Sequence, residues 1–249
     1  MMGMLSDTGN YRELNEDFVG CFEENEKRVY IVADGMGGHN AGEVASKIAV
    51  QKTLEYINSN FSSYSSKIDY LIIDAIKNSN RTIFELSQQD ISLRGMGTTI
   101  TACLAYNKKL LVANVGDSSC YILKKDGLHK VTKDHSLVQQ LLDIGSITEE
   151  EALIHPNKNI ITRALGTDID VDVDIFILDL TDIEKIILCT DGLSNNVNKK
   201  EMCDILLNYD NNEACVKMVE LSKQKGSKDN ISVIVFEGEC KNDRNFIRK

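Results

Sequence analysis

Aspartates that stand next to glycines at the edges of apolar segments are the clearest chemical feature of this sequence. Three residues share this placement, Asp34, Asp117 and Asp191, and a fourth acid, Asp229, directly precedes the apolar segment at residues 230–236. A neighbouring glycine lets the backbone approach a ligand closely, and carboxylate oxygens are the ligands that hard cations prefer. No cluster of histidines or cysteines accompanies these aspartates, so the residue types favour magnesium or manganese over zinc.

Two interpretations of this pattern stay open on spacing alone. Asp-Gly is also a common turn dipeptide, so Asp34-Gly35 and Asp191-Gly192 could each form an ordinary turn. The segment Ser6–Asp17 favours the metal site, because Arg12 is followed there by the paired carboxylates Glu16 and Asp17. An arginine suits bidentate binding of phosphoryl oxygens, and paired acids can hold metal-coordinated water.

The elements that must position these acids are short strands and amphipathic helices. Strand-like apolar runs occupy Val29–Ala33, Thr98–Ala105, Leu110–Val115, Cys120–Leu123, Ile186–Cys189 and Ile231–Phe236. Helical periodicity predicts one helix that opens at Asn40, a second around Ile68–Ile76, short helices that start at Ser136 and Thr148, and a last pair over Lys199–Leu207 and Asn211–Lys225. Helices that flank a run of closely connected strands indicate an α+β fold with antiparallel sheets.

Composition and charge exclude several classes of protein. The 249 residues carry 38 Asp and Glu against 28 Lys and Arg, a net charge of −10 that argues against nucleic-acid binding. No apolar run is long enough for a membrane helix, and no signal peptide is evident at the N-terminus. Seven cysteines without a C-x-x-C pair argue against a disulfide framework. We therefore expect a cytoplasmic monomer with no membrane insertion.

No repeat or linker divides the chain. We expect one catalytic domain over residues 1–240 and a charged tail over residues 241–249. The acids at Asp168, Asp170, Asp172 and Asp174 alternate with Ile and Val, which favours the exposed face of a strand over a calcium loop.

An ordered set of motifs resembles the metal-dependent (PPM, type 2C) Ser/Thr protein phosphatases, in the form found in bacterial signalling proteins. Ser6–Asp17 is similar to the S-D-x-G-x-x-R-x-x-N-E-D signature, and residues 32–39 (V-A-D-G-M-G-G-H) are similar to the second motif. Further similar motifs follow in the family's order at residues 95–99, 114–118, 134–136, 162–166, 189–193 and 228–232. The match covers about residues 6 to 236.

The resemblance implies a fold and a set of site residues. The implied fold is a four-layer α-β-β-α sandwich of two antiparallel sheets, with the metal site at one end between the sheets. Two Mn²⁺ or Mg²⁺ ions would be held by Asp34, Asp191 and Asp229, with Asp34 bridging them. The Gly35 carbonyl would add a ligand, Glu16 and Asp17 would act through metal-bound water, and Asp117 with Asp191 would hold a third ion.

The resemblance also implies the reaction. A hydroxide that bridges two metal ions would attack phosphoserine or phosphothreonine, while Arg12 grips the phosphate. Many eukaryotic members carry a histidine directly after the Asp-Gly of the second motif, where this chain has Met36. His39 is the candidate here for leaving-group protonation, and the alternative is that it shapes the glycine loop.

The implied substrates are phosphorylated proteins, including a cognate bacterial Ser/Thr kinase whose action this phosphatase would oppose. A second hypothesis is a non-catalytic regulator that binds phosphoproteins or metal on the same fold. Since every ligand position of the family is filled in this chain, the sequence favours the enzyme.

Overall fold

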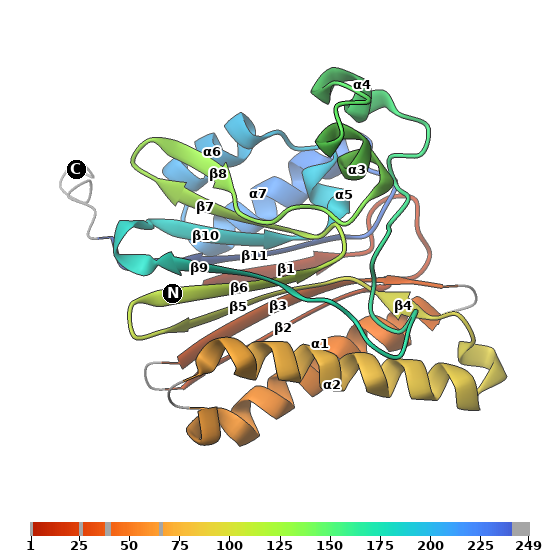
Figure 1. Ribbon diagram of the computed structural model, residues 1–249. Helices are drawn as coiled ribbons and strands as arrows, with labels where there is room; N and C mark the ends of the chain where they lie inside the picture. Colours follow the sequence, from red (N-terminus) through yellow and green to blue (C-terminus); the bar gives the residue numbers. More distant parts are fainter. Residues whose placement is uncertain (1, 25–26, 38–40, 65–66, 241–249) are drawn as a thin grey trace.

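Two antiparallel β-sheets packed face to face form the centre of the protein, and helices cover both outer faces (Figure 1). The computed structural model describes residues 2–24, 27–37, 41–64 and 67–240. The four layers confirm the α-β-β-α sandwich expected from the sequence. The predicted tail over residues 241–249 and the predicted helix start at Asn40 lie outside the described residues.

The first sheet has five strands in the order β1-β11-β10-β7-β8. Their bounds are β1 Met2–Asp7, β11 Ile231–Glu237, β10 Lys185–Cys189, β7 Ser119–Lys124 and β8 Gly127–Lys130. The sheet joins the two ends of the described chain, because β1 pairs with β11 along its whole length. Because β10 is antiparallel to both β7 and β11, the C-terminal end of β10 lies beside the N-terminal ends of β7 and β11, at one end of the sandwich.

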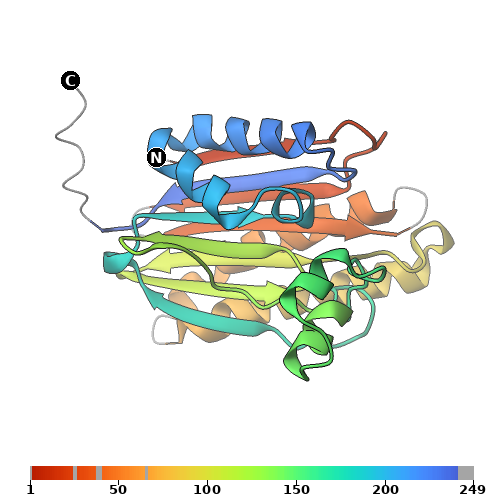
Figure 2. The same ribbon diagram turned by 90° about the horizontal axis from the view of Figure 1, so that it is seen from above.

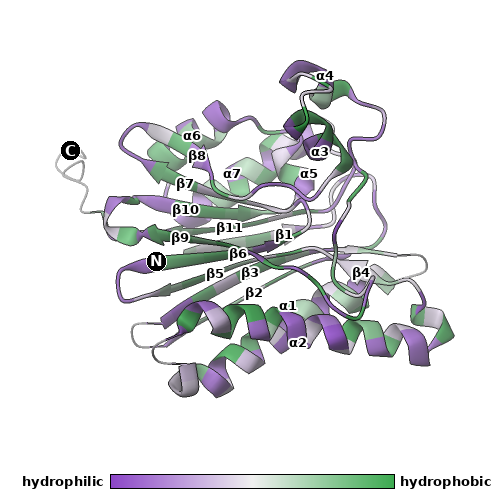
Figure 3. Ribbon diagram, in the orientation of Figure 1, coloured by the Kyte–Doolittle hydropathy of each residue, from purple (hydrophilic) through white to green (hydrophobic). Residues whose placement is uncertain are grey.

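The second sheet has six strands, with β2-β3-β5-β6-β9 in order and the short β4 paired to β3. Their bounds are β2 Asp17–Glu24, β3 Lys27–Met36, β4 Gly97–Thr98, β5 Ile100–Tyr106, β6 Lys109–Val115 and β9 Asp174–Asp179. The central strands are buried on both faces, as their near-continuous apolar sequences require. In Figure 3 these strands are coloured largely as hydrophobic, whereas α4 has both hydrophilic and hydrophobic parts.

Two helix pairs cover the outer faces of the sheets. The second sheet is covered by α1 Ala41–Asn60 and α2 Ile68–Gln89, whose buried side chains form one core cluster with it. The first sheet is covered by α6 Lys199–Asn208 and α7 Asn211–Gln224. A third cluster fills the space between the sheets, where Tyr30 of β3 stacks on Phe236 of β11 with 3.9 Å between the ring centroids.

Three short helices lie at the end of the sandwich where β4 is found. Figure 2 shows the molecule from above. They are α3 Leu137–Asp143, α4 Glu149–Ile154 and α5 Asp191–Ser194. Ser136 and Thr148 cap α3 and α4 through their side chains, as the sequence predicted. Single 3₁₀ turns occur at Phe61–Tyr64, Ile91–Leu93 and Leu180–Asp182. No helix of the described residues is long and apolar enough to cross a membrane.

The six predicted strands and the main helices are confirmed, but some boundaries are wrong. The strand predicted over residues 168–174 is wrong for all but its last residue, because β9 begins only at Asp174. The apolar run at Val29–Ala33 does not end before the acid, since β3 continues through Asp34 to Met36 by pairing with β4. The predicted strand over Thr98–Ala105 is interrupted at Thr99, whose N–H donates to the Asp34 carbonyl.

Candidate metal centre

One end of the sandwich gathers the aspartates that the sequence singled out. Asp17 opens β2 and lies directly opposite Asp34 of β3 in the antiparallel register. Asp191 begins α5 just after β10, and Asp229 lies just before β11, the strand that pairs with β10. Asp117 follows the end of β6. Five carboxylates from distant parts of the chain therefore share the end of the molecule where α5 and β4 lie (Figure 1).

Burial, together with mutual repulsion, favours the protonated form of Asp17, Asp34, Asp117 and Asp191. Burial raises the pKa of Asp34 well above its ordinary value, and the charges of Asp17, Asp191, Asp117 and Asp229 raise it further. Burial raises the pKa of Asp17 to about 7, with smaller contributions from Asp191 and Asp229. Such mutual shifts mean that the cluster is unstable as a set of bare anions and would be stabilised by a cation.

The other two buried acids show the same effect. Burial, followed by the charge of Asp191, raises the pKa of Asp117 to about 7. Burial and the charge of Asp229 raise the pKa of Asp191 to about 6, against a hydrogen bond with Asp34 that lowers it. The four buried acids therefore form one interacting set.

Unpartnered carboxylate oxygens test whether this set of residues fits a metal. Oδ1 of Asp17, Oδ1 of Asp117 and Oδ1 of Asp191 are each buried without a hydrogen-bond partner among the described residues. Over the same residues, no three acidic, histidine or cysteine side chains already converge as one ligand set. The acids nevertheless lie close enough to affect one another's pKa, and three of them have an unpartnered oxygen. An all-oxygen set of this kind fits Mg²⁺ or Mn²⁺.

Threonine hydroxyls hold two of the acids in place. The Thr190 hydroxyl donates to Oδ2 of Asp17 at 2.8 Å and accepts the backbone N–H of Ser232 at 3.0 Å. The Thr99 hydroxyl accepts the backbone N–H of Asp34 at 2.9 Å. The sequence placed Thr99 and Thr190 inside motifs but assigned them no role, because a hydroxyl beside an acid carries no signal until the strands are paired.

Arg12 lies at the open side of the cluster. Its guanidinium is 2.9 Å from Oδ1 of Asp229, and its side chain is 47% exposed. The charges of Asp229, Glu16 and Asp34 raise the pKa of Arg12 against the effect of burial. Burial raises the pKa of Glu16, against the nearby charge of Arg12. Arg12 and Glu16 therefore belong to the same site as the buried aspartates.

Two glycines permit the close backbone contacts that the site requires. A Cβ on Gly35 would collide with the carbonyl oxygens of Gly42 and Glu16, and a Cβ on Gly192 would collide with the carbonyl oxygen of Asn230. The Gly35 N–H donates to the Glu16 carbonyl at 3.1 Å. The Asp-Gly pairs are therefore required by packing at the site, whichever ligand the site binds.

The histidines have different positions. His39 lies outside the described residues. His135 lies next to the α3 cap, and its Nδ1 accepts the backbone N–H of Gly116 at 3.0 Å. Its Nε2 lies 3.1 Å from Oδ2 of Asp174. His135 thus holds the turn that carries Asp117 against β9.

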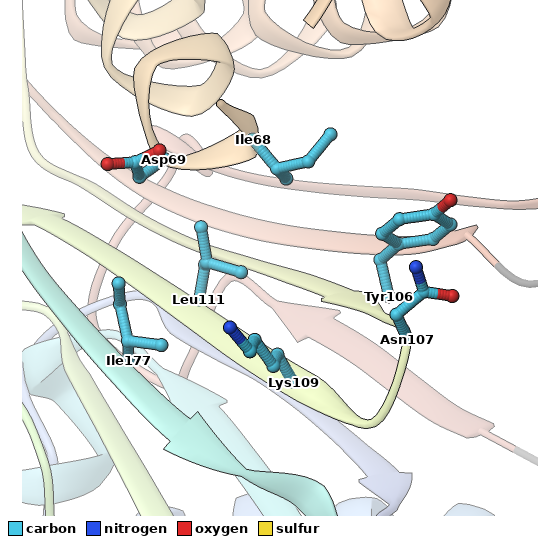
Figure 4. A pocket seen from close by; sticks show the side chains of 7 residues that line it. All are labelled: Ile68, Asp69, Tyr106, Asn107, Lys109, Leu111 and Ile177. Carbon is cyan, nitrogen blue, oxygen red and sulfur yellow. The ribbon is translucent and has the colours of Figure 1, made fainter. Parts of the chain in front are cut away.

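A cavity of about 440 Å³ lies at the opposite end of the sandwich, beside the β5–β6 turn (Figure 4). It is lined by Ile68, Asp69, Tyr106, Asn107, Lys109, Leu111 and Ile177. Only one carboxylate lines it. A groove of about 330 Å³ adjoins the acidic cluster and includes Asp191 and Asp229 in its wall. The chemistry of the site therefore points to this groove rather than to the larger cavity.

Comparison with known proteins agrees with this geometry. A family model described as protein phosphatase 2C matches residues 11–229. The serine/threonine phosphatase stp of Listeria innocua is 37% identical over 247 residues, which cover 98% of this chain and 96% of that protein. The fold resembles the crystal structure of the Mycobacterium tuberculosis serine/threonine phosphatase PstP/Ppp, with a TM-score of 0.87, 32% identity, and coverage of 96% of this chain and 98% of that one.

A further similar structure contains metal. The catalytic domain of the serine/threonine protein phosphatase PstP in complex with two manganese ions has a TM-score of 0.81 and 31% identity, and the match covers 94% of this chain and 96% of that one. The family match covers most of the chain, and the relatives cover nearly all of it. The chain therefore belongs to the protein phosphatase 2C family.

Proposed function

We propose that this protein phosphatase of the 2C type hydrolyses phosphoserine and phosphothreonine in proteins with two Mn²⁺ or Mg²⁺ ions. The observation that carries the proposal is the cluster of coupled aspartates, which has buried, unpartnered oxygens on Asp17, Asp117 and Asp191. Relatives named as serine/threonine phosphatases, and one such structure with two manganese ions, support the same conclusion.

The residues that would hold the ions are those of the cluster. We propose that Asp34, Asp191, Asp229 and the Gly35 carbonyl would hold the ions directly. Glu16 and Asp17 would act through coordinated water, and Asp117 would contribute to a third position. When bound, such ions lower the pKa of water to supply a nucleophile, and they neutralise charge on phosphoryl oxygens.

Arg12 and the buried acids have separate tasks. The exposed guanidinium of Arg12 lies at the mouth of the site, where it can donate to two phosphoryl oxygens when it leaves Asp229. The acids determine where cations can bind, because hydrogen bonds hold them in place. Thr190 bonds to Asp17, and Thr99 bonds to Asp34. We keep His39 as a candidate proton donor to the leaving serine or threonine oxygen.

Hydrolysis of a phosphothreonine peptide by the full chain tests the proposal. We expect phosphate release with saturating Mn²⁺ and none after chelation. Asp191→Asn should reduce turnover by about a hundredfold or more and lower the manganese binding measured by calorimetry. Asp182→Asn, an exposed acid at the other end of the sandwich, should change neither. Metal binding without any turnover would support the alternative, a non-catalytic regulator.

Two narrower parts of the proposal have their own tests. His39→Ala should slow hydrolysis of a phosphoprotein more than that of p-nitrophenyl phosphate, whose leaving group needs no proton; equal rates for variant and wild type would remove His39 from the mechanism.

A Ser/Thr kinase that phosphorylates itself is the partner we propose. Loss of its phosphothreonine on incubation with the manganese-loaded phosphatase would support this pairing.

A further inference from the structure

The groove beside the metal centre has walls from three separate parts of the chain. It is lined by Lys158, Asn159, Asp191, Gly192, Asn195, Asn196, Gly226, Ser227, Lys228 and Asp229. Lys158 and Asn159 follow α4, the Asn195 segment follows α5, and Gly226–Lys228 lead into Asp229. Because Asp191 and Asp229 belong to the acidic cluster, a peptide whose phosphate reaches that cluster would pass directly over this groove.

Two lysines of the groove carry charges that no described residue neutralises. Lys158 and Lys228 are both exposed, and neither belongs to any ion pair between described residues. Two nearby lysines differ: Lys223 pairs with Asp7 at 3.0 Å, and Lys225 pairs with Glu201 at 2.6 Å. The positive charges of Lys158 and Lys228 are therefore free to pair with an acidic group of a ligand.

Three other polar side chains of the groove form hydrogen bonds within the fold. The Asn195 side chain donates to Oδ2 of Asp191 at 3.1 Å, and the Asn196 side chain donates to the Gly192 carbonyl at 2.9 Å. The Ser227 hydroxyl donates to that same carbonyl at 2.9 Å. These residues build the wall of the groove, whereas the ammonium groups of Lys158 and Lys228 are available to a ligand.

We propose that this groove binds the residues that flank the phosphorylated serine or threonine, and that Lys158 and Lys228 select phosphoproteins with Asp or Glu at those positions. The inference rests on the proposed function, since it assumes that the phosphate itself is bound at the acidic cluster. A lysine-flanked substrate would be repelled at the same place. The two lysines thus give an acidic enzyme a means of attracting acidic segments.

Three peptides with the same central phosphothreonine test the selection. The two residues on either side are Glu in the first peptide, Gln in the second and Lys in the third. For the manganese-loaded full chain we expect kcat/KM to fall in that order. Each ion pair with a groove lysine that a peptide cannot form should lower kcat/KM by about threefold, which is the size of effect expected for an exposed ion pair. The preference should weaken as salt increases from about 50 to about 500 mM, because salt screens exposed charges.

Variants assign the preference to the two lysines. Lys158→Gln with Lys228→Gln should bring the three peptides to nearly equal kcat/KM through a higher KM for the Glu peptide, and Lys158→Glu with Lys228→Glu should reverse the order. Lys125→Gln, at the β7–β8 turn on the opposite end of the sandwich, should leave the order unchanged. The reversal is informative because a merely structural role would not produce it.

The outcomes separate this inference from the proposed function. If wild type hydrolyses all three peptides with equal kcat/KM, or if the reversed-charge variant keeps the wild-type order, the groove does not select acidic substrates and the inference is overturned. If wild type hydrolyses none of them with saturating Mn²⁺, the phosphatase activity itself fails first.

Discussion

The side-chain carbonyl of Asn230 accepts the backbone N–H of Glu16 at 2.8 Å. The amide of the same side chain donates to the carbonyls of Thr8 and Leu14, each at 2.9 Å. One buried residue at the start of β11 thus fixes both ends of the segment that carries Arg12. The position of the arginine proposed to bind phosphate depends on a residue from the opposite end of the sequence.

Replacing Asn230 with Ala should therefore loosen the Arg12 segment. The variant cannot form these three hydrogen bonds and leaves backbone groups unpaired, so we expect a decrease of about 1–3 kcal/mol in the free energy of unfolding. We also expect weaker competitive inhibition by inorganic phosphate, because Arg12 is no longer held over the site. Urea unfolding followed by circular dichroism suits a chain without tryptophan.

Asn208→Ala is a matched control for Asn230→Ala. Asn208 also donates from its side chain to a backbone carbonyl, that of Asp204, but it does so at an exposed helix end. This variant should change stability by less than about 0.5 kcal/mol and should leave phosphate inhibition as in wild type. Equal inhibition constants for Asn230→Ala and wild type would show that Arg12 does not depend on Asn230.

The buried acids make the stability of the metal-free protein depend on pH. The pKa is raised to about 7 for Asp17 and Asp117 and to about 6 for Asp191, from ordinary values near 3.8. Between about pH 4 and 7 the unfolded chain has released these protons and the folded chain still binds them. The free energy of unfolding should therefore fall as pH rises through this range and level off above it.

Divalent ions should oppose this decrease. Protons and Mn²⁺ compete for the same carboxylates, so the stabilisation by a fixed Mn²⁺ concentration should grow from about pH 5 to pH 8. Urea unfolding at several pH values, with Mn²⁺ or with chelator, measures both trends. A chelated protein whose stability stays constant or increases between about pH 5 and pH 7 would contradict the assignment of these acids as a mutually repelling cluster.

Thr190 should matter through its hydroxyl alone. Thr190→Val keeps the shape of the side chain but removes the hydroxyl that donates to Oδ2 of Asp17 and accepts the N–H of Ser232. We expect a decrease of about 1–3 kcal/mol in stability and weaker binding of Mn²⁺ by calorimetry. Thr190→Ser restores the hydroxyl and should recover both properties, whereas failure of Ser to recover them would assign the effect to the missing methyl group.

Much of this fold could be predicted from local sequence patterns. The six apolar strands were long enough or apolar enough to stand out, and Ser136 and Thr148 carried recognisable caps. The strands β1, β2, β8 and β9 were missed, and all four are only partly buried; β1, β2 and β8 also interrupt their apolar residues with glycine or polar residues. The segment around Asp174 shows why such strands are hard to predict. Residues 168–173 alternate acids with Ile and Val but form no strand, whereas β9 begins directly after them at Asp174.

The acids of the candidate site could be predicted from the sequence, but the residues that hold them in place by hydrogen bonds could not. Aspartates beside glycines are visible one at a time, and the resemblance to a family supplied their order. The partners Thr190, Thr99 and Asn230 reach the acids across sheets and over long sequence separations. Their roles follow only from register and packing, which no local pattern contains.

Gly192 provides a steric test of the same packing. A Cβ at this position would overlap the carbonyl oxygen of Asn230, in the residue that fixes the Arg12 segment, and lie 3.4 Å from the Cβ of Asp229. Because a backbone group cannot move aside as a flexible side chain can, Gly192→Ala should cost about 3 kcal/mol or more and should weaken Mn²⁺ binding. Gly145→Ala is the control: Gly145 has a φ of +69° but open space around it, so only the left-handed backbone conformation should cost energy, about 1–2 kcal/mol. Urea unfolding measures both values, and a Gly192→Ala variant no less stable than Gly145→Ala would mean that α5 and the start of β11 can separate without disturbing the site.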